Sequence, residues 1–214
     1  MFCIYEEVCT NKCVPNSCLR NLEMSYLLKT SGIPQNRQRL FSLTPDSCDY
    51  DTFCTLADIK DNIKNFVDSG DNLYIVSKTT GNGKTSWAIK LMLKYFDTVW
   101  AGNGLRTRAV FVHVPTFLLK CKNFNSVDQE FEDLKSILTT VDLVVWDDIG
   151  STGMSNYDLS QLLMYIDQRV LGQKANIYTG NLMFEDLDKT LGSRLASRIW
   201  NTSSIAELKG KDKR

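Results

Sequence analysis

Apolar residues along this chain follow two patterns that alternate from about residue 56 onward. One recurs every three to four residues and predicts amphipathic helices, while the other is a short apolar run that predicts a buried strand. Helices are expected over residues 57–67, 84–96, 129–138, 157–170 and 187–199. Strands are expected over residues 73–77, 108–114, 141–146, 176–179 and 204–208. This alternation predicts an α/β fold with a parallel five-stranded sheet in a three-layer sandwich.

The first 55 residues are different, with few β-branched runs and many Cys and Asn residues. They hold one predicted helix, over residues 17–28. Gly32-Ile33-Pro34 ends it, because Gly caps a helix and Pro cannot continue one. A polar connector is expected over residues 35–55. The sequence therefore predicts a small Cys-rich N-terminal domain with a linker, residues 1–55, and a larger domain, residues 56–214.

Composition narrows the class of protein. The 214 residues are 43% hydrophobic and 23% charged, which is typical of globular proteins. The 25 basic and 25 acidic residues balance, so contact with nucleic acid would need a local patch. No apolar run approaches the ~20 residues that cross a bilayer, and no signal peptide precedes Cys3. A soluble, intracellular protein with no membrane partner is expected.

A phosphate-binding loop is predicted between the strand 73–77 and the helix 84–96. The segment 78–85 reads Lys-Thr-Thr-Gly-Asn-Gly-Lys-Thr, close to the P-loop pattern, but Lys78 replaces its first glycine. Main-chain N–H groups of such a loop cradle phosphates, a Lys reaches the terminal ones, and a Thr hydroxyl joins the Mg²⁺ shell. A chance Gly-Lys-Thr is the alternative, but the strand–loop–helix context favours a nucleotide site. Its predicted members are Thr80, Gly81, Asn82, Gly83, Lys84, Thr85 and Ser86.

Two carboxylates follow the apolar run 143–146. Asp147 and Asp148 would then lie at the carboxyl edge of a parallel strand, where α/β sheets bind ligands. Asp147 is predicted to hold Mg²⁺ together with Thr85, and Asp148 to orient and deprotonate the attacking water. The alternative is a helix cap or turn. A spacing of about sixty residues after the P-loop favours the catalytic interpretation.

Two further positions complete the predicted catalytic set. Asn181, after the strand 176–179, is predicted to contact the water or the γ-phosphate, and a turn residue is the alternative. Arg194 and Arg198 lie one helical turn apart, so that one of them is predicted to reach the γ-phosphate of a neighbouring subunit. Solvated surface arginines are the alternative.

Four of the seven cysteines crowd the first eighteen residues: Cys3, Cys9, Cys13 and Cys18. Four thiolates suit tetrahedral Zn²⁺, and a domain this small needs a bound metal or a cross-link to stabilise its fold. Ordinary buried or free thiols are the alternative, and Cys48 or Cys54 could replace one ligand. The single histidine, His113, lies within an apolar strand and is predicted to be packed in the core.

Together these motifs resemble the AAA+ ATPases, most closely the DnaC/DnaI/IstB-like branch. The resemblance spans about residues 30–214. It rests on the P-loop and on the following segments: Gly32-Ile33-Pro34, residues 112–119, Trp146-Asp147-Asp148-Ile149-Gly150, Thr179-Gly180-Asn181, Ser197-Arg198-Ile199 and residues 210–214.

This resemblance implies an ATP-dependent loader of a DnaB-type replicative helicase in the cytoplasm of a bacterial cell, and the compact chain fits a phage-encoded member. Family members bind ATP or ADP with Mg²⁺, contact single-stranded DNA and self-associate through the ATPase domain. The N-terminal domain grips the helicase, and in DnaI-type loaders it carries zinc. Without a lid domain, hydrolysis is expected to be slow or partner-dependent.

Residues near Phe117 and Phe124, namely Lys120 and Lys122, are candidates for DNA contact, as are the terminal Lys209, Lys211, Lys213 and Arg214. A solvated helix end is the alternative for Lys120 and Lys122, and solvated terminal side chains are the alternative for the others. Two other functions stay open: an IstB-like transposition helper, and a module that binds ATP without hydrolysing it and acts on a replication protein.

Overall fold

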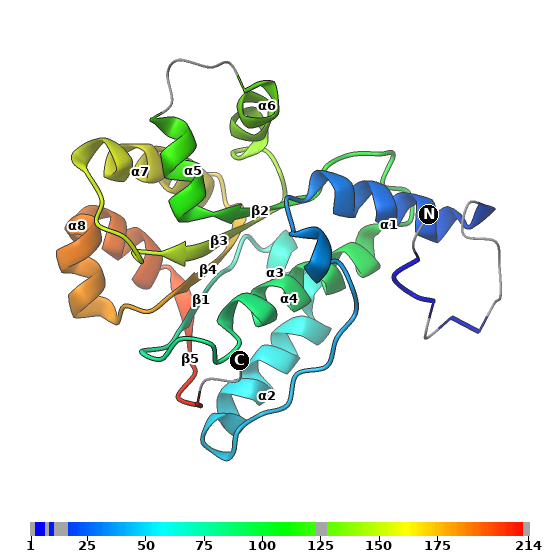
Figure 1. Cartoon of the computed structure of the whole chain (residues 1–214), viewed down its shortest axis with the longest axis horizontal. Coiled ribbons are helices and arrows are strands. Elements are labelled where there is room, and N and C mark those ends of the chain that lie inside the picture. The colour runs from blue at the N-terminus through cyan, green and yellow to red at the C-terminus, as the bar shows by residue number, and fades with distance from the viewer. Residues whose placement is uncertain (1–2, 7–8, 11–16, 123–127, 212–214) are drawn as a thin grey trace.

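A parallel sheet of five strands organises the computed structural model, which describes residues 3–6, 9–10, 17–122 and 128–211. The strand order is β2-β3-β4-β1-β5, and every neighbouring pair is parallel (Figure 1). The strands are β1 (Asn72–Val76), β2 (Ala109–His113), β3 (Leu143–Ile149), β4 (Ala175–Gly180) and β5 (Ser203–Glu207). The predicted α/β fold with a five-stranded parallel sheet is confirmed.

Helices cover both faces of the sheet, which gives the predicted three layers. One face carries α1 (Leu19–Thr30), α2 (Tyr50–Asp61), α3 (Ile63–Asp68) and α4 (Lys84–Val99). The other carries α5 (Val114–Cys121), α6 (Gln129–Ile137), α7 (Asn156–Leu171) and α8 (Phe184–Trp200). Two 3₁₀ turns, η2 (Gln35–Arg37) and η3 (Ser47–Asp49), lie between α1 and α2. In the described part of the chain, no helix has the length and apolar content that crossing a bilayer demands.

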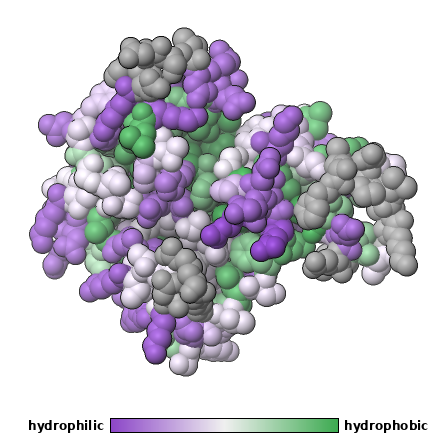
Figure 2. Space-filling model, in the orientation of Figure 1, coloured by the Kyte–Doolittle hydropathy of each residue, from purple (hydrophilic) through white to green (hydrophobic). Residues whose placement is uncertain are grey.

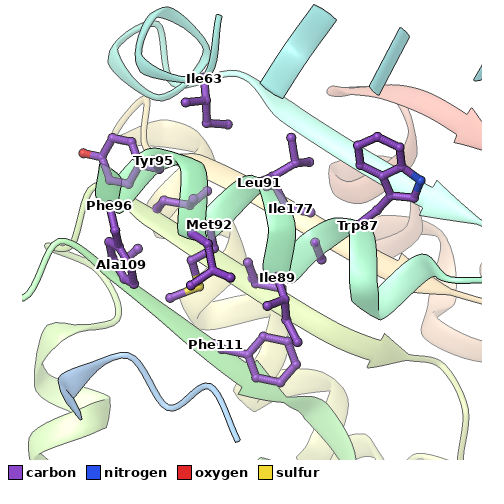
Figure 3. Close-up of a cluster of buried hydrophobic side chains, with 14 of the residues drawn as sticks. Ile63, Trp87, Ile89, Leu91, Met92, Tyr95, Phe96, Ala109, Phe111 and Ile177 are labelled. Carbon is purple, nitrogen blue, oxygen red and sulfur yellow. The ribbon is translucent and has the colours of Figure 1, made fainter. Parts of the chain in front are cut away.

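Each face of the sheet packs against its own hydrophobic cluster, because successive strand residues point to opposite sides. In β3, Val145 belongs to the cluster under α4, whereas Val144 and Trp146 belong to the cluster under α5 and α7. Figure 3 shows side chains of α4, among them Leu91 and Met92, above the strands. This burial fixes α4, and with it the loop that precedes α4, against the centre of the sheet.

Three local predictions were wrong. The helix expected over residues 57–67 is interrupted at Asn62, whose φ of −106° and ψ of 22° separate α2 from α3. Residues 114–121 form the helix α5, which none of the predicted helix ranges includes. His113 is exposed rather than packed in the core, because it is the last residue of the edge strand β2, and its Nδ1 lies 2.8 Å from Thr116 Oγ1.

The described N-terminal residues share the core of the larger domain. Met24, Leu27 and Leu28 of α1 are buried in the same cluster as α4. After α1, the Ser31 carbonyl accepts a 2.6 Å hydrogen bond from the main-chain N–H of Phe111 on β2. A separate Cys-rich N-terminal domain is therefore not supported. The division at residue 55 falls inside α2, and as a boundary between domains it stays a prediction.

Candidate functional site

A cavity of about 420 Å³ opens at the carboxyl edge of the sheet, beside the first turn of α4. The P-loop, the end of β3 and the residue after β4 contribute to it. The structure thus brings together three motifs that are spread over about a hundred residues of the chain. Its lining residues are Arg37, Thr80, Gly81, Gly83, Lys84, Thr85, Ser86, Asp147, Asp148, Ser151 and Asn181.

The P-loop takes its shape from two glycines with positive φ, Gly81 at 73° and Gly83 at 101°. These are left-handed conformations that glycine adopts without the steric penalty of a Cβ. Gly83 is also the N-cap of α4, so the N-terminal N–H groups of this helix face the cavity, as in an anion site. Lys78, at the position of the first P-loop glycine, has no positive φ. The departure from the motif therefore causes no backbone strain.

The side chain of Asn82 does not line the cavity. Its amide group donates to Ser77 Oγ, to Thr79 Oγ1 at 3.1 Å and to the Leu208 carbonyl at 3.2 Å. Thr79 Oγ1 in turn donates to the Gly210 carbonyl at 3.0 Å. These bonds tie the P-loop to the segment after β5. A main-chain contact of Asn82 with nucleotide stays a prediction.

Asp147 is the centre of a hydroxyl network. Its Oδ1 accepts hydrogen bonds from Thr85 Oγ1 at 2.8 Å and from Thr179 Oγ1 at 2.7 Å. Burial raises the pKa of the Asp147 carboxyl, and the two hydroxyl bonds oppose that rise. The predicted magnesium pair, Thr85 and Asp147, is thus in direct contact. Hydroxyl and carboxylate oxygens are ligands that suit Mg²⁺.

Asp148 lines the same cavity as Asp147, although neighbours in a regular strand point to opposite faces. The reason is a register shift between β3 and β4 around Trp146 and Ile149, with Asp148 at a φ of 64°. The Asp148 main-chain N–H donates to Thr179 Oγ1 at 3.0 Å. Thr179, which sequence analysis gave no role of its own, therefore holds both acids, and the motif order along the chain does not reveal this.

Asn181 lines the cavity beside these acids. Its Oδ1 is buried and has no hydrogen-bond partner among the described residues. A buried acceptor without a donor costs about 1–3 kcal/mol. This oxygen is therefore suited to a ligand that brings an O–H or N–H group, such as a water molecule positioned for attack.

The two predicted finger arginines lie away from the cavity. Both are on α8 beyond Gly192, which interrupts the helix with a φ of 75° and a ψ of 151°. Arg198 Nε pairs with Asp167 of α7 at 2.5 Å, and Arg194 pairs with the same carboxylate at 3.4 Å. Action on a neighbouring copy stays a prediction.

The predicted zinc site is not supported. Cys13 lies outside the described residues. Within the ranges that the structure describes, no three His, Cys, Asp or Glu side chains form a group that could hold a metal ion. Cys3 packs against the core, while Cys48 and Cys54 are exposed.

The candidate DNA-contact residues have structural partners. Lys120 pairs with Asp128 and Lys122 with Asp158, each at 2.7 Å. Phe117 is buried against Trp146 and Tyr165. Phe124, Lys213 and Arg214 lie outside the described residues. DNA contact at these positions stays a prediction.

A second, smaller cavity of about 180 Å³ shares Gly83 with the first. Its lining is mixed: the apolar and aromatic side chains are Leu43, Pro45, Phe53, Trp87 and Leu208, and the polar and acidic ones are Ser42, Thr44, Asp46, Asp49 and Asn82. The Phe53 and Trp87 rings pack edge to face with their centroids 4.9 Å apart. Sequence analysis missed this cavity, because residues 35–55 carry no motif that marks it.

Comparisons with known proteins agree with this geometry. A model of the family described as IstB-like ATP binding protein matches residues 46–214. The crystal structure of the DnaC helicase loader is 19% identical, with a TM-score of 0.65 over 78% of this chain and 94% of that chain. The crystal structure of DnaI is 17% identical, with a TM-score of 0.63 over 85% of this chain and 94% of that one.

The replication initiator DnaA, bound to AMPPCP and single-stranded DNA, is 14% identical with a TM-score of 0.60, over 80% of this chain and 49% of that chain. No curated protein sequence matches the chain. At identities below 25%, the likeness to solved structures shows the fold alone.

Proposed function

We propose an ATP-dependent loading function for this chain, which belongs to the family of IstB-like ATP-binding proteins and, with it, to the DnaC/IstB-like AAA+ ATPases. In this proposal the chain binds ATP and Mg²⁺, assembles with copies of itself and delivers a DnaB-type replicative helicase to single-stranded DNA. The observation that carries the proposal is the single cavity formed by Lys84, Thr85, Asp147, Asp148 and Asn181.

The residues of this cavity fit a nucleotide with its metal. The N-terminus of α4 and Lys84 offer positive charge to phosphates, and the bonded pair of Thr85 and Asp147 offers oxygen ligands to Mg²⁺. When bound, Mg²⁺ neutralises charge on the phosphate oxygens. The smaller cavity beside Gly83 combines the aromatic rings of Trp87 and Phe53 with polar side chains, a chemistry that suits the base.

Hydrolysis in this proposal depends on two side chains. Asp148 is the base that orients and deprotonates the attacking water, and the unpartnered Oδ1 of Asn181 accepts a hydrogen bond from the same water. Arg198 or Arg194 would leave its ion pair with Asp167 and complete the nucleotide site of a neighbouring copy. Turnover by the isolated chain is then expected to be slow.

The proposed loader function is supported by the functions of two proteins with similar structures. One is a helicase loader, and one is an initiator bound to single-stranded DNA. The test is native mass spectrometry of the chain with the replicative helicase of its host, with and without ATP. A complex of a helicase hexamer with several copies of the chain is expected. If no complex forms under either condition, the loader function is wrong, whereas the proposal that the chain binds ATP is not affected.

The matched family description favours one alternative, a transposition helper of the IstB-like type. The same measurement with a transposase in place of the helicase separates the two. A module that binds ATP without turnover is the other alternative, and measurable ATP hydrolysis in the presence of single-stranded DNA and partner would exclude it. Free-protein mass in the same spectra tests the zinc prediction, since bound Zn²⁺ adds about 63 Da after proton loss.

A further inference from the structure

Arg37 reaches the nucleotide cavity from the segment before α2. It is the last residue of η2, the short turn between α1 and α2 in Figure 1, and it is exposed. Its Nη1 donates a 3.2 Å hydrogen bond to Ser86 Oγ in the first turn of α4. Arg37 therefore lies beside the helix N-terminus that closes the P-loop.

Charge at the cavity makes this position significant. The charged side chains that line it, among the described residues, are Arg37, Lys84, Asp147 and Asp148. Two carboxylates suit Mg²⁺ but repel a polyphosphate, and Lys84 offsets only one of them. Arg37 supplies half of the positive side-chain charge at the cavity.

Hydrogen bonds within residues 33–38 hold the turn that carries Arg37 in place, and the Arg37 main-chain N–H donates to the Pro34 carbonyl at 2.8 Å. The Gln38 side-chain amide donates to the Ile33 carbonyl at 2.7 Å, and buried Ile33 follows the Ser31 carbonyl that bonds to β2. Figure 2 shows hydrophilic side chains gathered over the η2 region, in front of α4. The guanidinium has five N–H donors, and within the described part of the chain only one of them is used, in the bond to Ser86, which leaves most of this planar fork for an anion.

We propose that Arg37 is a ligand for the phosphate chain of a nucleoside di- or triphosphate, supplied within the same chain by the N-terminal segment. Nucleotide binding then fixes residues 35–37 against α4. This inference rests on the proposed nucleotide function and extends it. The family match begins at residue 46, so it assigns nothing to Arg37.

Isothermal titration of the full chain with ATP and with ADP, each with Mg²⁺, tests the inference. Arg37→Ala is expected to weaken binding of both nucleotides about tenfold, the low end for a hydrogen bond to a charged group, because Arg37 is exposed. Arg37→Lys keeps the positive charge but loses the planar set of donors, so its affinity for nucleotide should lie between those of the unaltered chain and Arg37→Ala. Arg39→Ala is the matched control, an exposed arginine outside this cavity, and should stay within twofold of the unaltered chain.

Amide hydrogen exchange gives a second readout. Exchange in residues 35–39 should slow on adding ATP to the unaltered chain and to Arg39→Ala, but not to Arg37→Ala. Equal affinities for Arg37→Ala and Arg39→Ala, or equal protection by ATP, would overturn the inference while leaving nucleotide binding intact. Failure of the unaltered chain to bind ATP at all would instead overturn the proposed function, and this inference with it.

Discussion

Replacing Thr179 with valine isolates the contribution of one hydroxyl to the site and to stability. Thr179 is 1% exposed, and valine has nearly the same shape, so the change opens no large cavity. The hydroxyl donates to the Asp147 carboxylate and accepts from the Asp148 N–H. A bond to a charged group contributes about 1.5–3 kcal/mol, and an orphaned buried N–H costs about 1–3 kcal/mol.

The expected net loss is about 2–3 kcal/mol, below the sum, because Asp147 keeps its bond from Thr85. For a chain of this size, that loss lowers Tm by about 5–10 °C. Thermal unfolding followed by circular dichroism, without nucleotide, measures it. Thr179→Ser keeps the hydroxyl and should recover most of the difference.

Thr98→Val is the matched control. Thr98 is exposed on α4, and its hydroxyl donates to the Lys94 carbonyl one turn earlier. This surface change should alter stability by no more than about 0.5 kcal/mol. If Thr179→Val and Thr98→Val lower Tm equally, the network around Asp147 does not stabilise the fold, and the argument for Thr179 fails.

Four other changes give sharp outcomes. Lys84→Ala should abolish ATP binding in calorimetry, and unchanged affinity would move the phosphate site elsewhere. Asp148→Asn should still bind ATP but release no phosphate, whereas normal turnover would assign the base to another residue. Burial raises the pKa of the Asp147 carboxyl in the folded protein above 3.8, its value in the unfolded chain. The folded protein therefore holds the ionised carboxylate less favourably than the unfolded chain does, and this lowers the free energy of unfolding at pH values above 3.8. Without Mg²⁺, Asp147→Asn should therefore melt higher than the unaltered chain at pH 7, and the gap should close as pH falls toward that value; a lower Tm at pH 7 contradicts this. Arg169 is fully buried and donates to several main-chain carbonyls, so Arg169→Leu should lower Tm by about 10 °C or prevent folding, and a Tm within 2 °C of the unaltered chain would show that those carbonyls need no donor.

The sequence predicted those parts of the site that consist of a short motif next to a recognisable strand or helix. The P-loop lies between an apolar run and a periodic helix, and the acids at Asp147 and Asp148 end another apolar run. Parallel strands end at a common edge, so these motifs had to meet there. In the structure Lys84, Asp147 and Asn181 do line one cavity at that edge, while their roles toward a nucleotide stay predictions.

Arg37 and Thr179 could not be predicted in the same way. The place of Arg37 depends on how the segment after α1 crosses the edge strand β2 and returns to α4. The role of Thr179 depends on the register shift between β3 and β4. Neither the path of that segment nor the register shift produces a residue spacing that can be recognised in a single sequence.

The helix α5 was missed although its signal was present. Val114, Phe117, Leu118 and Cys121 are its buried residues, and their spacing is helical. Pro115 lies in its first turn, where proline is well tolerated. The apolar run of β2 leads directly into this helix, so the change of period was hidden within one continuous apolar stretch.

The order of strands in the sheet has a consequence for synthesis of the chain. The interior strand β1 is flanked by β4 and β5, which follow it by about a hundred residues or more. At translation rates of about 5–20 residues per second, the ribosome needs about 5–20 s to make that intervening chain. Throughout this interval the nascent chain carries an apolar β1 with no neighbour on either side. Chaperone binding near residues 72–76, or slower growth at low temperature, should therefore govern how much of the protein is recovered in soluble form.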